Sequence, residues 1–326
     1  MSTRAADPPP VGQAGRGERA QGVAALVGAV VIWGSTYVVI KDALDDIGPL
    51  TLAFARFLVV TPLLLPLAVR AGLRPVHLRQ PRFWLFGATG VTVYFGLQNL
   101  GIALTTAGSA ALIAAAIPGV TALLAFALLG ERPSARRWTG IALSTVGVAL
   151  IVGSGLDLGA WQAVVGNLIV LASTVAWAFY TVQGRRLGAG TAPLVSTTAG
   201  FVTGTALLLP LAAAEVAVSG WPTLTGSMVA AVAYLGVFGS GLAMLLWNVG
   251  VSRLEASAAG PFTNVVPVVG LAFAVAVGEP VSPLQLLGGT VAGVGIVITQ
   301  RDAPPAPPRR RGRGRSRTTP PAAARR

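Results

Sequence analysis

Aromatic and hydroxyl side chains occur at helical spacing inside two of the apolar stretches of this chain. Trp33 precedes Thr36 by three residues and Tyr37 by four, so the three side chains share one face of a helix. Trp177 and Tyr180 repeat this spacing in the second half of the chain. Such rings and hydroxyls could line a cavity that binds an organic solute. The alternative is an aromatic belt at a membrane surface, where Trp and Tyr are common.

Amide and phenol groups form a second set of candidates. Tyr94 and Gln98 lie four residues apart, and Asn248 lies near the end of another apolar stretch. Lipid leaves such groups poorly satisfied, so we expect them to face the interior of a helix bundle. There they could bind a solute, or they could form structural hydrogen bonds between helices.

Prolines interrupt two of the apolar stretches. Pro118 lies within one, and Pro267 lies within another, three residues after Asn264. A proline frees a backbone carbonyl from its usual partner, so Asn264 and the freed carbonyls could bind polar groups of a ligand. A plain kink that lets the helices pack or flex explains both prolines equally well.

Arg56 is the one charged residue well inside an apolar stretch. At the centre of a membrane helix an arginine costs about 2.5 to 3.5 kcal/mol on insertion scales, so its guanidinium must reach a partner, water or the headgroups. Two interpretations follow. Arg56 could bind a carboxylate or phosphate of a substrate through paired hydrogen bonds. It could instead lock the bundle by bonding to a carbonyl or to Asp45 and Asp46.

Bond-breaking chemistry has no clear candidate residues. The chain has no Cys, its single His is His77 in a basic stretch, and none of its Asp or Glu residues lies near the centre of an apolar stretch. Thiol catalysis, metal clusters and the usual carboxylate of a proton or sodium site therefore lack their side chains. We expect a protein that is not an enzyme and that holds no cofactor and no metal.

Composition places the chain in a membrane. Apolar residues make up 53% of the chain and charged residues 11%. The apolar stretches are close to the ~20 residues that span a bilayer, and helices satisfy their own backbone groups there. The sequence therefore predicts an all-α integral membrane protein with ten transmembrane helices. The expected ranges are 21–40, 48–69, 83–103, 106–129, 138–154, 162–184, 194–214, 226–251, 256–277 and 284–300.

The second half of the chain repeats the first. Five residues recur 149 positions later: Asn99, Gly101, Ala107, Ala110 and Pro118 return as Asn248, Gly250, Ala256, Ala259 and Pro267. Trp33 and Lys41 match Trp177 and Arg185 at a spacing of 144. We expect two five-helix repeats, 21–154 and 162–300, joined by an extracytoplasmic linker at 155–161. An odd number of helices in each repeat makes the two repeats inverted relative to each other.

Charge predicts the orientation and the character of both tails. With a cytoplasmic N-terminus, all of the 24 Lys and Arg residues except Lys41 and Arg56 lie inside, as the positive-inside rule requires. Residues 1–20 and the Arg/Pro-rich residues 301–326 are expected to be disordered cytoplasmic tails. The basic C-tail is expected to contact anionic lipid rather than nucleic acid, with another partner as the alternative. The sequence does not indicate an oligomeric state.

Short motifs in this order resemble a known transporter family. They are Trp33-Gly34-Ser35-Thr36-Tyr37, Phe54-Ala55-Arg56-Phe57, Gly108-Ser109-Ala110-Ala111-Leu112, Gly130-Glu131-Arg132 and Trp138-Thr139-Gly140. Together with their partial duplication they resemble the EamA family of the drug/metabolite transporter superfamily, over about residues 21–300. The resemblance implies ten helices in two halves, cytoplasmic ends, and export or exchange of amino acids or other small metabolites.

The expected function is that of a secondary transporter in the cell membrane. It would export small organic solutes such as amino acids or related metabolites, by alternating access to a cavity between the two repeats. A drug permease or a nucleotide- or sugar-metabolite permease of the same superfamily is one alternative. A membrane scaffold or sensor that transports nothing and recruits partners through its basic tail is an alternative of a different class.

Overall fold

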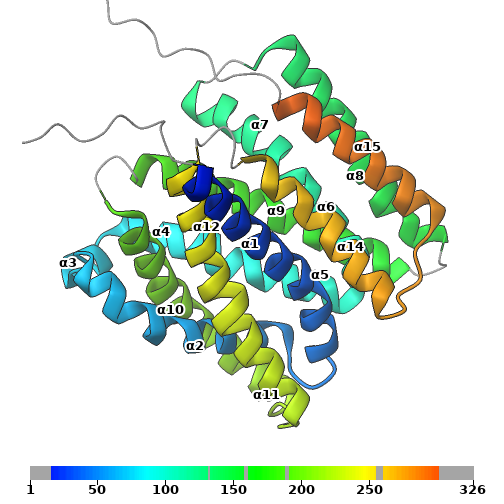
Figure 1. Cartoon of the computed structure of the whole chain (residues 1–326). Coiled ribbons are helices and arrows are strands. Elements are labelled where there is room, and N and C mark those ends of the chain that lie inside the picture. Colours follow the sequence, from blue (N-terminus) through cyan, green and yellow to red (C-terminus); the bar gives the residue numbers. More distant parts are fainter. Residues whose placement is uncertain (1–15, 131–132, 158–160, 188–190, 255–259, 301–326) are drawn as a thin grey trace, which may run out of the picture.

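The computed structural model describes residues 16–130, 133–157, 161–187, 191–254 and 260–300, and every regular element among them is a helix (Figure 1). Seven of these described helices are long and apolar enough to cross a membrane, and two shorter apolar helices accompany them. Lipid offers no hydrogen-bond partner to a backbone amide, so a chain this apolar must satisfy its amides within helices. The protein is therefore a multi-pass membrane protein whose described residues form only helices.

The helices of the first half follow the expected order, with short irregular turns inside two of them. Their bounds are α1 Arg16–Ala43, α2 Pro49–Arg70, α3 Pro75–Leu78, α4 Pro81–Gly87, the π-helix η1 Ala88–Val93, α5 Tyr94–Leu104, α6 Ala107–Ile113, the 3-10 helix η2 Ala114–Ala116, α7 Ile117–Leu129 and α8 Ala135–Asp157.

The second half has the same plan. Its elements are α9 Trp161–Leu187, α10 Pro193–Ser219, α11 Gly226–Ala233, the π-helix η3 Tyr234–Leu242, α12 Ala243–Arg253, the 3-10 helix η4 Gly260–Val265, α14 Val266–Ala276 and α15 Pro283–Gln300.

Each expected range overlaps a described helical segment, with three differences. Helix α1 begins at Arg16, inside the expected 1–20 tail. Four of the expected helices are composites, because a π-helix or a 3-10 helix joins or precedes their α-helical parts. The third difference is that α8 extends to Asp157, into the expected 155–161 linker. Residues 1–15, the remainder of that linker at 158–160 and the tail 301–326 lie outside the described residues.

The irregular turns recur at matching positions of the two halves. The π-helices η1 and η3 overlap when the chain is shifted by 149 residues, the spacing that relates Asn99 to Asn248. The same shift superposes the 3-10 helices η2 and η4. Both kinds of turn are therefore part of the repeated unit. π-turns inside helices are rare and often lie at functional sites.

The two halves pack against each other in exchanged pairs (Figure 1). Helix α5 packs on α9, and its counterpart α12 packs on α1; likewise α7 packs on α9, and α14 packs on α1. Helices that are each other's counterparts also meet, α2 on α10 and α8 on α15. Each of these contacts therefore has a counterpart in which the two halves exchange places.

Helices α8 and α15 touch through glycines. A Cβ added at Gly140 would lie 2.6 Å from the carbonyl oxygen of Gly295, and one added at Gly288 would lie 2.6 Å from that of Gly147. Gly140, near the start of α8, thus meets Gly295, near the end of α15, while Gly147 meets the earlier Gly288. The two helices therefore run antiparallel. Small residues permit this backbone contact, which stabilises helix pairs in lipid, where no hydrophobic effect drives association.

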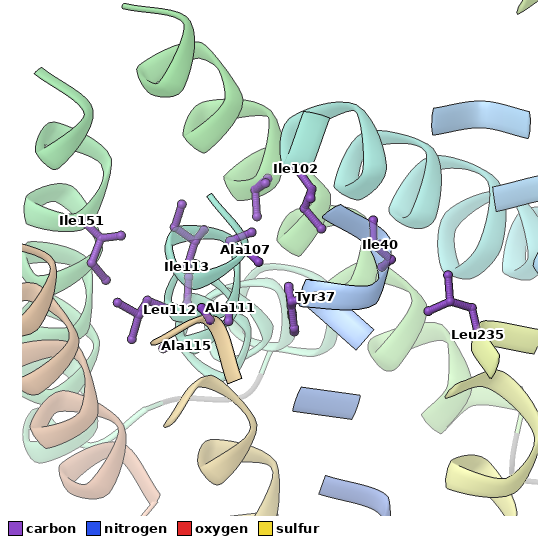
Figure 2. Close-up of a cluster of buried hydrophobic side chains, with 14 of the residues drawn as sticks. Tyr37, Ile40, Ile102, Ala107, Ala111, Leu112, Ile113, Ala115, Ile151 and Leu235 are labelled. Carbon is purple, nitrogen blue, oxygen red and sulfur yellow. The ribbon is translucent and has the colours of Figure 1, made fainter. Parts of the chain in front are cut away.

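A buried apolar cluster lies where α1, α5 and α6 meet (Figure 2). Tyr37 and Ile40 of α1, Ile102 of α5 and Ala111 of α6 belong to it. The first turn of α6 is tied to the second half, because the Glu279 carboxylate accepts hydrogen bonds from the backbone amides of Ala107 and Gly108, both at 2.9 Å. Glu279 therefore has a structural role at a helix N-terminus, where a negative charge is favourable.

Two alanine substitutions in α8 test the glycine contact. Gly147→Ala places a methyl against the backbone of Ala292 and Gly288, so we expect a loss of about 1–3 kcal/mol, as for other overpacked sites. Gly153→Ala is the matched control, since nothing lies within 4 Å of its new methyl. We expect it to be neutral or to stabilise by about 0.5–1 kcal/mol. Thermal unfolding in detergent measures the stability of both variants. Equal melting temperatures for Gly147→Ala and Gly153→Ala would contradict the glycine contact.

Candidate functional site

A small cavity of about 40 Å³ lies between the two halves. Helices α1, α2 and α5 and the π-helix η1 contribute from the first half, and α9, α10, α12 and η3 contribute from the second. Its lining residues are Trp33, Phe57, Gly90, Phe95, Trp177, Tyr180, Phe201, Gly239, Ser240 and Met244. Such a volume holds a few water molecules but not an organic solute, so the cavity is closed in this conformation.

Aromatic rings make up most of the lining. The indole N–H of Trp33 donates to the carbonyl oxygen of Gly239 at 3.1 Å, which joins α1 to η3. Tyr180 lies 5.0 Å from Trp177 between ring centroids and stacks on Phe86 at 4.1 Å. These contacts hold the rings in fixed orientations around an apolar space.

Phe57 and Phe201 meet at the cavity. They are equivalent residues, 144 positions apart, and their ring centroids lie 5.0 Å from each other. The equivalent residues Thr61 and Thr205 also meet, with their hydroxyl oxygens 3.4 Å apart. The cavity, which Phe57 and Phe201 both line, therefore lies where equivalent segments of α2 and α10 meet.

A hydrogen-bonded polar group lies one layer behind the rings. The Gln98 amide donates to the Tyr94 hydroxyl at 2.9 Å, and the Tyr37 hydroxyl interacts with the same two side chains. Tyr94 also packs on Trp177, with ring centroids 4.6 Å apart. All three polar residues are buried. A movement of Trp177 would bring these groups next to the cavity.

Arg56 lies beside the cavity and is 2% exposed. Its Nε donates to the Ser240 hydroxyl at 3.1 Å, and its Nη2 donates to the Leu235 carbonyl oxygen at 3.4 Å. The guanidinium carbon lies 4.4 Å from the centroid of the Phe95 ring, at cation–π distance. Asp45 and Asp46, the carboxylates considered from the sequence, are not among its hydrogen-bond partners.

The π-helices place two glycines at the cavity. A Cβ at Gly90 of η1 would overlap the Tyr180 ring, and a Cβ at Gly239 of η3 would lie 3.0 Å from the Thr36 methyl and 3.2 Å from Arg56 Nη2. Side chains at either position would displace the residues that shape the cavity. Thr36 itself bonds to the Trp33 carbonyl of its own helix at 2.6 Å.

The structure brings together most of the residues singled out from the sequence. Trp33, Trp177 and Tyr180 line the cavity, Thr36, Arg56 and Tyr94 contact its lining, and Tyr37 and Gln98 belong to the polar group behind it. Asn248 and Asn264 are not among the lining residues. Asn248 lies in α12 and Asn264 in η4.

Pro118 and Pro267 lie away from the lining, each at the start of an α-helix. Pro118 is in the first turn of α7, directly after the 3-10 helix η2, and Pro267 is in the first turn of α14, directly after η4. A proline is well tolerated there, because the amide it lacks would have no partner within the helix. Both prolines therefore follow a change of helix type.

Sequence reasoning did not single out several lining residues. Phe57 stood in the Phe54-Ala55-Arg56-Phe57 motif, and its position next to Arg56 was a usable signal. Ser240 and Phe95 carried no such signal, because serine and phenylalanine are common in apolar helices. The π-helix η3 turns Gly239 and Ser240 toward Arg56, and apolar patterning does not reveal a π-turn.

Comparisons with known proteins agree on one family. The model of the EamA-like transporter family matches residues 20–153 and again residues 164–301. A protein of Streptantibioticus cattleyicolor described as a probable terminal-alkyne amino-acid exporter is 33% identical over 303 residues, which cover 91% of this chain and 96% of the relative. A probable amino-acid metabolite efflux pump of Escherichia coli is 30% identical over 299 residues, which cover 86% of this chain and 94% of the relative.

A solved structure shares the fold. A crystal structure with 24% sequence identity superposes with a TM-score of 0.60 and covers 86% of this chain and 97% of that chain. At this level of identity the likeness concerns the architecture alone.

Ser240→Ala tests the hydrogen bond that positions Arg56. Removing the hydroxyl takes away the acceptor of Nε, so we expect a loss of about 1–3 kcal/mol, the cost of an unsatisfied buried donor. Ser252→Ala is the control, because the exposed Ser252 hydroxyl bonds only to the Val249 carbonyl of its own helix. Thermal unfolding of the two variants gives the comparison. The same small shift in both would mean that Ser240 does not hold Arg56.

Proposed function

This chain belongs to the EamA-like transporter family, and we propose that it is a secondary transporter that exports amino acids or related small metabolites through the cavity between its two halves. The observation that carries the proposal is the doubled family match over residues 20–153 and 164–301, together with a cavity at the place where the two matched halves meet. Both halves supply its walls, as expected for a site that opens by their relative movement.

The names of the relatives support this solute class. Two proteins that match over most of this chain are described as exporting a terminal-alkyne amino acid and an amino-acid metabolite. The lining fits such solutes. Its aromatic rings can pack on an apolar side chain, while the polar group behind them, Tyr37, Tyr94 and Gln98, can supply hydrogen bonds when the cavity enlarges.

We propose ten transmembrane helices in two inverted five-helix repeats, 21–154 and 162–300. The antiparallel contact of α8 with its counterpart α15 supports the inversion, because a two-fold axis in the membrane plane reverses the direction of equivalent helices. The exchanged packing of α5 on α9 and of α12 on α1 supports it as well.

Alternating access requires this closed cavity to enlarge toward one side at a time. The changes of helix type at η1, η2, η3 and η4 are suitable places for bending, since π- and 3-10 turns have weaker hydrogen-bond geometry than α-helix. Pro118 and Pro267 lie directly after two of them. We propose these prolines as the kinks about which the ends of α7 and α14 move.

In the proposed orientation both termini are cytoplasmic and the protein lies in the cell membrane. The excess of Lys and Arg on the loops that would then face the cytoplasm supports it. The nine Arg residues after position 300 would contact anionic lipid. A drug or nucleotide- or sugar-metabolite permease of the same superfamily would use the same cavity for a different solute.

Flux measurements in proteoliposomes test the proposal. The purified full chain is expected to move L-propargylglycine, a terminal-alkyne amino acid, saturably and without chemical change. Trp33→Ala and Trp177→Ala should raise the half-saturating concentration roughly tenfold, since about 1.5 kcal/mol of aromatic packing corresponds to that factor. Trp161→Ala is the matched control, because Trp161 is 69% exposed and away from the cavity.

The outcomes separate the alternatives. Flux no greater than that of protein-free liposomes would contradict transport of this amino acid. An effect of Trp161→Ala as large as that of Trp33→Ala would contradict the location of the site. Flux of drugs or nucleotide sugars in place of the amino acid would favour the other permease functions.

Deletion of residues 301–326 tests the scaffold alternative. A carrier should keep its L-propargylglycine flux within about a factor of two, because the cavity lies entirely within residues 33–244. Flux per inserted protein, with membrane insertion measured separately, is the readout. Loss of flux from a truncated protein that still inserts would show that the basic tail is essential to the activity.

A further inference from the structure

The contacts of Arg56 described above use only part of its hydrogen-bonding capacity. Resting on the transport function proposed above, we infer that Arg56 is the receptor for a carboxylate group of the transported solute. The inference narrows the proposed amino acids and related metabolites to solutes that carry a carboxylate. It depends on the charge, the donors and the neighbours of this one side chain.

Arg56 has no anionic partner among the described residues. The side chain is buried, and no carboxylate of the described residues forms a hydrogen bond or a salt bridge with it. A buried cation normally has an anionic partner, because desolvation disfavours an isolated charge. The ring face of Phe95 provides only partial compensation. A solute anion that enters the cavity would supply the missing charge.

Donors of the guanidinium are left unused on one side. An arginine has five N–H groups, of which Nε and Nη2 each use one here, on Ser240 and Leu235. The Nη1 atom is buried and has no hydrogen-bond partner. The free edge therefore consists of Nη1 and the second N–H of Nη2. That edge matches the two oxygens of a carboxylate, which arginine binds through parallel hydrogen bonds.

Three neighbours of Arg56 line the cavity. Phe95, whose ring lies under the guanidinium, and Ser240, which accepts from Nε, both line the cavity. Gly239, another lining residue, has no side chain, and a Cβ there would come within 3.2 Å of Nη2. A side chain at this position would crowd the guanidinium, which is itself buried directly behind the lining.

The same geometry indicates which solutes are disfavoured. An amine without a carboxylate would bring a second positive charge beside Arg56 with nothing to neutralise either. An amino acid can place its carboxylate on Arg56 and its ammonium against the faces of Trp33, Trp177 or Tyr180, which line the same cavity. A purely structural Arg56, bonded to η3 and nothing else, would show no preference between these solutes.

The test uses the full chain and four probes: one amino acid and three compounds that each differ from it by one group. They are L-propargylglycine, its amide, 4-pentynoate, which lacks the ammonium, and but-3-yn-1-amine, which lacks the carboxylate. Binding is measured from the shift in thermal unfolding of the detergent-purified protein, and transport is measured as competition with L-propargylglycine flux. We expect the two carboxylates to bind about 10- to 100-fold more tightly than the amide and the amine.

Substitution of Arg56 should remove that preference. In Arg56→Gln the carboxylates are expected to lose their 10- to 100-fold advantage, while the amine binds at least as well as before because the repelling charge is gone. Lys41→Gln is the control. It removes a cation that bonds to the Ile102 and Ala103 carbonyls at the end of α5, away from the cavity, and it should leave the preference unchanged.

Each result decides the inference. Equal binding of acid and amide by the unaltered protein, or a carboxylate preference that persists in Arg56→Gln, would overturn it. If Arg56→Gln does not fold, Arg56→Lys decides, because lysine lacks the planar fork: a reduced preference supports the inference and a full preference overturns it. A carboxylate preference in binding without any flux would refute transport and still support Arg56 as the receptor.

Discussion

Close backbone contact between helices holds the two halves of this protein together. Lipid is as apolar as leucine, so burying apolar side chains gains little, and packing must supply the stabilisation. Gly140 and Gly147 of α8 meet Gly295 and Gly288 of α15, and Gly101 of α5 meets Gly166 of α9 in the same way. A side chain larger than hydrogen at these points would separate the halves. The position of the cavity between them depends on this contact.

The cavity combines an apolar lining with one buried cation. Trp33, Trp177 and Tyr180 form rigid walls, and Arg56 stands behind Phe95 with part of its guanidinium unpaired. Such an arrangement is unfavourable for an empty protein in lipid, since both the void and the charge lack partners. Functional sites often retain features that reduce stability, because the same features become favourable when the ligand is present.

Apolar patterning predicted where the helices lie but not how each is built. Each expected range overlaps a described helical segment, and seven of the described helices are long and apolar enough to span a bilayer, because the length of an apolar stretch is set by membrane thickness. The π-turn that directs Ser240 at Arg56 was missed, since it changes neither hydropathy nor residue type. Helical spacing grouped Trp177 with Tyr180, and both line the cavity. For Asn248 and Asn264 the spacing did not indicate which side of the helix faces the cavity, and neither residue is among the lining residues.

The meeting of Phe57 with Phe201 bears on how such a protein could have arisen from a shorter ancestor. If two identical copies associated about the two-fold axis proposed above, each would bring its own Arg56, and two like charges would crowd one small space. In the present chain the position equivalent to Arg56 is Gly200. Fusion of the copies into one gene therefore has a physical advantage: it allows a single charge beside the axis, and a polar solute then has only one favourable way to lie.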